Sequence, residues 1–170
     1  MLNITDIDFI NLVGSRLKSC MTFKKIDARE LANCSGVSLA QIYRVISGCS
    51  NTPIKTLYKL VSSLKISFYA FFNFEVPIDS ISNDINIYTF DDELKSLIQN
   101  LKIHQHKLSR LKGLTQVKIA DELGLSSYKY IGYILNGKKN SYVNIKVSTL
   151  YNLCKCLELE DKLYTLFRMN

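Results

Sequence analysis

Proline is scarce in this sequence, since Pro53 and Pro77 are the only two in 170 residues. Residues that favour strands rarely alternate with polar residues for long, so the period of two expected of a half-buried strand is missing. Hydrophobic residues make up 47% of the chain, which is enough for a packed core and argues against a disordered protein. We therefore expect an all-α fold.

No hydrophobic run is long enough to span a bilayer. The longest, residues 66–74, is interrupted by Ser67 and Asn73 and is far shorter than the roughly 20 residues that a membrane helix needs. The N-terminus has no basic segment followed by an apolar one, as a signal peptide would require. We expect a soluble, cytoplasmic protein with no membrane partner.

The patterns typical of metal sites and enzymes are also missing. His104 and His106 are two residues apart and would not share a helical face, so we interpret them as surface histidines. We find no nucleophile–base pair, glycine-rich phosphate loop or paired carboxylates, and expect neither an enzyme nor a cofactor. The cysteines are odd in number and lack CxxC spacing: Cys20, Cys34, Cys49, Cys154 and Cys156. We expect reduced, mostly buried thiols.

Positive charge is present in excess, with a formal net charge of +7. Residues 1–75 contain nine Lys/Arg and five acids, and residues 93–170 contain thirteen Lys/Arg and six acids. Residues 76–92 contain four aspartates and no basic residue, together with Pro77 and serines. We therefore expect two basic domains, 1–75 and 93–170, joined by an acidic linker. Basic domains suit a polyanion, although ordinary solubility charge explains the excess equally well.

An internal repeat supports this division. Leu31-Ala32 aligns with Ile119-Ala120, and Gly48 aligns with Gly137, so the second copy has one extra residue between these points. An amphipathic segment precedes and follows each copy, which predicts about five short helices in each domain.

Each copy begins with the signals of a short helix followed by a turn. Asp27 and Glu30 have the spacing of a capping box, and Thr115 is the matching cap in the second copy. Gly36 and Gly124 follow, where a tight turn needs a left-handed backbone.

A second helix follows in each copy. Ser38 and Ser127 are its predicted N-caps. Two apolar residues three apart should face inward: Ile42 and Val45 in the first copy, Ile131 and Ile134 in the second. Gly48 and Gly137 are the glycines expected at its end.

Both halves resemble the Xre-type helix-turn-helix family, which includes phage lambda repressor and Cro. The segments 113–116 (Gly-Leu-Thr-Gln) and 130–139 (Tyr-Ile-Gly-Tyr-Ile-Leu-Asn-Gly-Lys-Lys) are especially similar to it. The resemblance implies two tandem five-helix, lambda-repressor-like helix-turn-helix domains, each with a second helix that enters the major groove of double-stranded DNA.

Carried onto this chain, the resemblance implies specific contact residues. The first reading helix offers Ser38, Leu39, Gln41, Tyr43 and Arg44, and the second offers Ser127, Tyr128, Lys129, Tyr130 and Tyr133. Gln41 suits adenine, Arg44 suits guanine or a phosphate, and Lys129 suits either a base or a phosphate. Contacts to the backbone are expected from Lys55, Gln116, Lys138, Lys139 and Asn140. The first copy departs from the family pattern, because Ala28 stands where the family has a glutamine, the position of Gln116 in the second copy.

The function implied is a transcriptional repressor of phage or mobile-element type. The alternative is a protein-binding inhibitor or antitoxin that also represses its own gene, because a patch of tyrosines in the second copy is nearly as typical of a protein interface. A third function, an adaptor without nucleic acid, is disfavoured by the charge. Five aromatic residues between Phe68 and Phe74 should pack either the two halves together or two chains, as in a homodimer.

Overall fold

The computed structural model describes residues 5–81, 89–137 and 144–168, and these are mostly helical with no strand among them. The expected all-α class is confirmed. The first half of the chain forms α1 (Asp6–Lys24), α2 (Ala28–Ser35), α3 (Leu39–Ile46), α4 (Ile54–Ser63) and α5 (Phe68–Phe72), followed by a short 3-10 helix, η1 (Ile78–Ser80). The second half forms α6 (Phe90–Lys112), α7 (Gln116–Glu122), α8 (Lys129–Leu135), α10 (Val147–Cys156) and the 3-10 helix η2 (Glu160–Phe167).

The local signals for helix ends act as predicted, with the exception of Ser127 before α8. Asp27 accepts hydrogen bonds from the backbone N–H groups of residues 29 and 30, and Glu30 completes the capping box. Thr115 caps α7 through the N–H of Lys118. Gly36, Gly48, Gly124 and Gly137 all have positive φ. Such caps satisfy orphan backbone groups at helix ends through neighbours in sequence, so they can be inferred without tertiary information.

Equivalent backbone conformations recur in the two halves beyond the predicted segments. After α4, Lys65 adopts a left-handed conformation with φ of 56°, and Glu158 adopts the same conformation after α10 with φ of 57°. The next residues close the turn in the same way, since Ile66 N donates to Val61 O and Leu159 N donates to Cys154 O. Left-handed backbone is uncommon for residues other than glycine, which makes the coincidence informative.

In the first half, α1 crosses the end of α3 at very close range. A Cβ at Gly14 would lie 2.4 Å from Val45 O and 3.2 Å from Ile46 O, and Gly48 is equally crowded by the side chain of Asn11. Only a residue without a side chain allows two backbones to approach so closely. Gly14 therefore positions α3 on α1.

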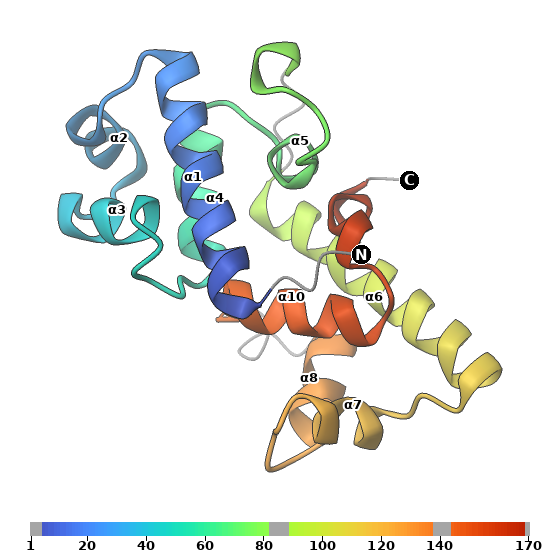
Figure 1. Ribbon diagram of the computed structural model, residues 1–170. Coiled ribbons are helices and arrows are strands. Elements are labelled where there is room, and N and C mark those ends of the chain that lie inside the picture. Colours follow the sequence, from blue (N-terminus) through green and yellow to red (C-terminus); the bar gives the residue numbers. More distant parts are fainter. Residues whose placement is uncertain (1–4, 82–88, 138–143, 169–170) are drawn as a thin grey trace.

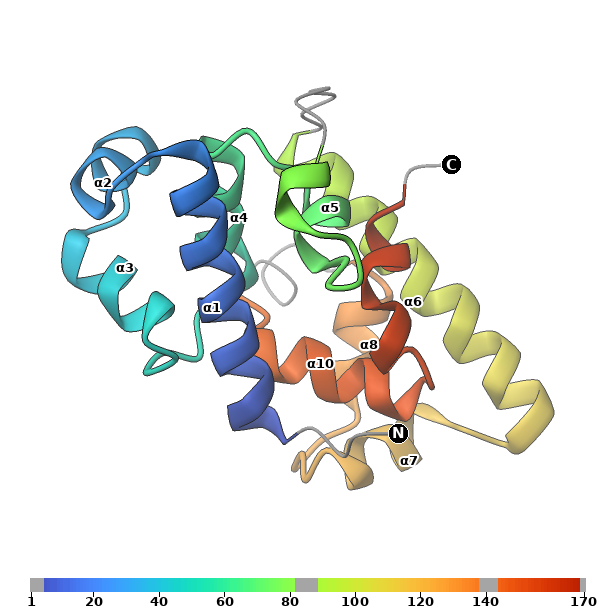
Figure 2. The same cartoon turned by 45° about the horizontal axis from the view of Figure 1, so that its top comes forward.

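The two halves pack against each other through α5 and η2. Phe72 and Phe167 stack with their ring centroids 5.1 Å apart and an interplanar angle of 9°, and Phe68 meets Phe167 edge-on at the same distance. All three rings are buried. The predicted aromatic cluster thus joins the two halves of one chain, and both views show α5 beside the C-terminal segment (Figures 1 and 2).

Arg16 of α1 holds the end of α5 and the residues after it against α1. Its buried guanidinium donates hydrogen bonds to four backbone carbonyl oxygens: Phe71 O, Ala70 O, Asn73 O and Val76 O. Asn100 makes the corresponding bond in the second half, since its Nδ2 donates to Leu166 O at 3.0 Å. Burial lowers the pKa of Arg16, but the carbonyl oxygens satisfy its donors.

The acidic connector is shorter in the structure than its composition suggests. Residues 90–92 belong to the first turn of α6, because Thr89 caps that helix in a capping box with Asp92. At the other end of the connector, η1 packs against α1. The sequence Ile-Asn-Ile-Tyr at residues 85–88 would suit a short strand, but this segment lies outside the described residues.

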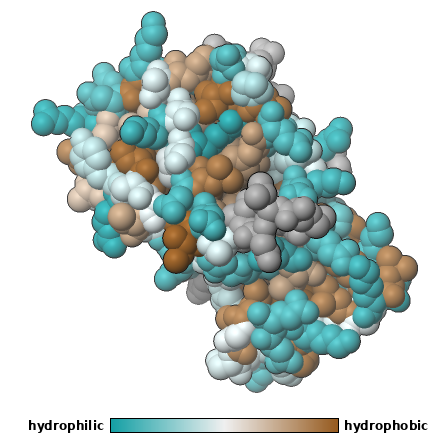
Figure 3. Space-filling model, in the orientation of Figure 1, coloured by the Kyte–Doolittle hydropathy of each residue, from teal (hydrophilic) through white to brown (hydrophobic). Residues whose placement is uncertain are grey.

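None of the helices described combines the length and the apolar character needed to cross a bilayer. On the face shown in Figure 3, hydrophilic and hydrophobic residues are interspersed. Exposed hydrophobic residues such as Ile7 of α1, Leu111 of α6 and Val117 of α7 are scattered over different helices.

One carboxylate, Glu93 of α6, is buried between the halves with a relative exposure of 3%. Phe68 N donates a hydrogen bond to Glu93 Oε1 at 3.1 Å, whereas Oε2 has no partner among the described residues. Desolvation raises the pKa of Glu93 to about 7, and the bond from Phe68 opposes that shift. Desolvation raises the pKa of Tyr58, and the negative charge of the Glu93 carboxylate raises it further.

We expect Gly14→Ala to lower the free energy of unfolding by about 2–3 kcal/mol, because the new Cβ meets the carbonyl of Val45. The gain in helix propensity of alanine over glycine, about 1 kcal/mol, opposes this loss without cancelling it. Urea denaturation followed by circular dichroism measures the difference. Ser15→Ala, at an exposed position of the same helix, should change stability by less than about 0.5 kcal/mol. A Gly14→Ala variant as stable as the parent would show that α1 and α3 are not in close contact.

We expect Glu93→Gln to remove a pH dependence of stability. The pKa of Glu93 is higher in the folded than in the unfolded chain, so the folded state holds the proton between about pH 4.5 and 7. Stability is therefore lost as the pH rises through this window, by no more than about 3 kcal/mol. Denaturation at pH 5 and pH 8 should show the variant gaining stability over the parent only at the higher pH. Glu75→Gln, an exposed control, should follow the parent, and an equal effect of Glu93→Gln at both pH values would contradict the assignment.

Candidate nucleic-acid interface

In the first half, α3 buries one face and exposes the other. Ile42 and Val45 are buried against the core, as predicted. Tyr43 and Arg44 are exposed, with Tyr43 at 53%, and Gln41 is half-buried. Leu39 is half-buried and packs against the core. Ser38 caps the helix by accepting a hydrogen bond from Gln41 N at 3.3 Å, so its hydroxyl already has a structural role.

The same division applies to α8. Ile131 and Ile134 are buried as predicted. Lys129 and the rings of Tyr128 and Tyr133 are exposed, the two rings at 50% and 39%. Ser127 differs from its expected role, because its hydroxyl accepts from Lys129 N at 3.2 Å while Tyr128 occupies the N-cap position.

Tyr130 is less available than the other tyrosines of α8. It is half-buried and packs against the core, and desolvation raises the pKa of its hydroxyl. Tyr130 is therefore a weaker candidate for contact with a ligand than Tyr128 or Tyr133.

Gln116 lies between the first and second helices of the second motif. A Cβ at Gly132 would be 3.0 Å from Gln116 Oε1, so the amide occupies the space left by the missing side chain. Gly132 of α8 thereby lets the start of α7 approach α8. The glutamine that the family resemblance singles out is half-buried at this junction.

Positive charge near α3 and α8 comes from exposed side chains on several helices. Arg44 and Lys129 form no ion pair with any residue that the structure describes. Lys55 is exposed in the first turn of α4. Lys118 of α7 is also exposed, although it is not among the contact residues that the family resemblance implies. Lys138, Lys139 and Asn140, expected to contact phosphates, lie outside the described residues.

The two motifs lie on either flank of the molecule. Figures 1 and 2 show α2 and α3 on one flank and α7 and α8 on the other, with α4 and α10 between them. The contact between α5 and η2 lies to one side of all four helices. Among the described residues, Tyr43 and Arg44 of α3 and Lys129 and Tyr133 of α8 remain exposed in this arrangement.

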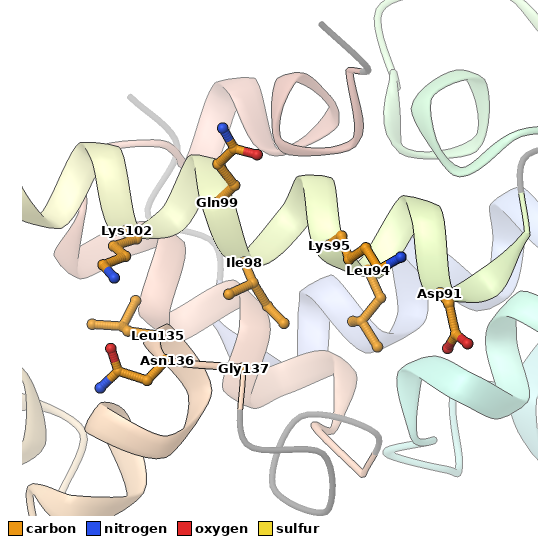
Figure 4. A pocket seen from close by; sticks show the side chains of 9 residues that line it. All are labelled: Asp91, Leu94, Lys95, Ile98, Gln99, Lys102, Leu135, Asn136 and Gly137. Carbon is orange, nitrogen blue, oxygen red and sulfur yellow. The ribbon is translucent and has the colours of Figure 1, made fainter.

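A pocket of about 680 Å³ lies between α6 and the end of α8. Figure 4 shows Ile98 and Lys102 of α6 facing Leu135 and Asn136 of α8. Counted from the caps of α1 and α6, Ile98 is the counterpart of Gly14, and its side chain prevents the close approach seen in the first half. Apolar and charged side chains line the pocket without a buried polar group aimed into it, so its geometry assigns no ligand.

Among the described residues, no cluster of three or more His, Cys, Asp or Glu side chains has the arrangement of a metal site. All five cysteines are free thiols, but the expectation that most are buried is wrong. Cys20 and Cys154 are buried, whereas Cys34 and Cys49 are exposed. Cys34 lies away from the face of α2 that buries Ala28 and Leu31, and Cys49 follows α3 in a loop.

The chain matches no family model, no curated protein and no solved structure. The resemblance to the Xre-type family therefore rests on the sequence pattern alone.

We expect the five thiols to fall into distinct classes of reactivity toward a disulfide reagent at neutral pH. Cys34 and Cys49 should react first, because they are exposed. Cys20 and Cys156 should react slowly, since desolvation raises their pKa values to about 11 and 12, respectively. The measurement is the time course of thiol release with and without denaturant. A Cys34→Ser/Cys49→Ser variant that kept the fast phase would contradict this placement.

Proposed function

We propose that this protein is a sequence-specific DNA-binding regulator, a transcriptional repressor of phage or mobile-element type, made of two tandem lambda-repressor-like helix-turn-helix domains. The observation that carries the proposal is the repeated unit of short helix, glycine turn and second helix, formed by α2–α3 and by α7–α8. In each unit the second helix buries its apolar residues and exposes polar and aromatic ones, as a helix that reads DNA must.

The exposed side chains of α3 and α8 supply the chemistry for base recognition. Arg44 can donate two hydrogen bonds to guanine, and Gln41 can both donate to and accept from adenine. Lys129, at the start of α8, suits guanine or a phosphate, and the tyrosine hydroxyls can bond to either. Lys55 and Gln116 are placed in helix first turns that suit contacts with the sugar–phosphate backbone.

The charge of the chain supports a polyanionic partner. Net positive charge resides in both halves, and Arg44, Lys55, Lys118 and Lys129 are exposed. Neutralising phosphates with such side chains releases condensed counterions, so affinity for DNA should fall steeply as the salt concentration rises.

A second function, protein binding by one of the motifs, is favoured by the tyrosines. Tyr43, Tyr128 and Tyr133 are exposed on α3 and α8, whereas the described part of α8 carries a single lysine. Aromatic side chains of this kind frequently anchor protein interfaces. An inhibitor or antitoxin that also represses its own gene would use one motif for each partner.

Selection from a library of random duplexes, followed by titration of the enriched and a scrambled duplex at two salt concentrations, tests the proposal. We expect Arg44→Ala and Lys129→Ala each to weaken binding to the enriched duplex by about 1–3 kcal/mol, a loss of about 5- to 150-fold. Lys162→Ala in η2 is the control for loss of one positive charge, and it should leave the preference for the enriched duplex intact. Failure to enrich any sequence would favour the protein-binding alternative, and unchanged affinity in both variants would exclude α3 and α8 as reading helices.

A further inference from the structure

Equivalent segments of the two halves meet each other where α4 and α10 begin. Ile54 N donates to Ile145 O at 2.8 Å, and Val147 N donates to Thr52 O at 3.0 Å. Ile54 and Val147 are the first residues of α4 and α10 and so are equivalent positions. Exchanging the two halves therefore converts one hydrogen bond into the other. This reciprocity is the defining property of a two-fold contact between identical surfaces.

Side chains extend the reciprocal contact. Tyr151 of α10 stacks on Phe9, four residues after the cap of α1, with ring centroids 4.1 Å apart. Tyr58, its equivalent in α4, packs on Phe90, the first residue of α6, at 4.9 Å, so the two tyrosines contact the same helix of the other half through different residues. The packing of α5 against η2 is a contact of the same kind, because α5 follows α4 and η2 follows α10. The halves are thus related by an approximate two-fold axis that passes through both contacts.

A two-fold axis fixes where the reading helices lie. Any element and its symmetry mate are at the same height along the axis, so α3 and α8 lie at one height, on opposite sides of the axis. The arrangement in Figures 1 and 2 agrees, since α2–α3 and α7–α8 flank the α4–α10 contact while α5 and η2 lie together elsewhere. Homodimeric helix-turn-helix proteins place two reading helices on successive turns of one groove by such symmetry.

The symmetry of the backbone is not matched by the exposed side chains. When the two motifs are aligned so that Ser38 matches Ser127 and Gly48 matches Gly137, Ala40 corresponds to Lys129 and Arg44 to Tyr133. A cation therefore lies at the start of α8 and near the end of α3. Side chains that differ at equivalent positions would read different bases.

We propose that the contact between the halves takes the place of a subunit interface, so that one chain binds, as a monomer, a single duplex with two unlike half-sites at a fixed separation. This inference rests on the proposed function. The duplex it requires is non-palindromic, with half-sites centred about one helical turn, or roughly 10 base pairs, apart. Because the contact is packed and hydrogen-bonded, the separation tolerates no adjustment.

The first test is stoichiometry and spacing on the enriched duplex. Sedimentation velocity should give a complex of one chain per duplex. An insertion of about 5 base pairs between the half-sites and an insertion of about 10 should each reduce affinity by at least about tenfold, because a rigid protein cannot adjust the distance or the angle between its two reading helices. Two chains on a palindromic duplex, or full affinity after the 10-base-pair insertion, would overturn the inference while leaving sequence-specific binding, and so the proposed function, intact.

The second test assigns each motif to its half-site. Two duplexes are made, each with a different half-site scrambled. Arg44→Ala should no longer weaken binding to the duplex that lacks the half-site read by α3, and Lys129→Ala should no longer weaken binding to the duplex that lacks the half-site read by α8. If both substitutions stayed effective on both duplexes, each half-site would be read by both motifs, as in a homodimer, and the inference would fail. Absence of any sequence preference in the parent protein would overturn the proposed function, and this inference with it.

Discussion

The stacking of α5 on η2 is the contact on which the arrangement of the two halves depends. Phe68, Phe72 and Phe167 are each almost completely buried there, and aromatic rings of this size bury more apolar area than any other side chains. Left uncovered, the same rings would form an apolar patch prone to aggregation. By covering them within one chain, the protein gains a core that neither half has alone.

The first helix carries the polar and steric constraints that make this contact specific. Arg16 binds four carbonyl oxygens around the end of α5, and Gly14 admits the end of α3. Hydrophobic burial favours compactness without a preferred geometry, whereas directional hydrogen bonds and a backbone approach at glycine select one orientation. Phe9 on the same helix reaches Tyr151 of the other half, so α1 links α3, the proposed reading helix, to the contact between the halves.

The two halves share a backbone plan but differ in detail, and the differences bear on the proposed function. The close crossing at Gly14 gives way to a pocket beside Ile98 in the second half. The exposed surface of α3 carries an arginine where α8 carries a tyrosine. A duplicated fold whose two copies present different side chains can recognise an asymmetric partner, which two identical subunits related by a two-fold axis do not.

The sequence by itself determined the helices, their ends and their inward faces, because caps, glycine turns and the spacing of Ile42 and Val45 depend on residues within a few positions of one another. It also named Tyr43, Arg44, Lys129 and Tyr133, which are exposed, but with them Leu39 and Tyr130, which are half-buried against the core. Only the tertiary structure decided how the halves meet, why Glu93 is buried and why Cys34 is exposed. Those outcomes depend on contacts such as that between Phe68 N and Glu93, which join distant segments and leave no periodic pattern in the chain.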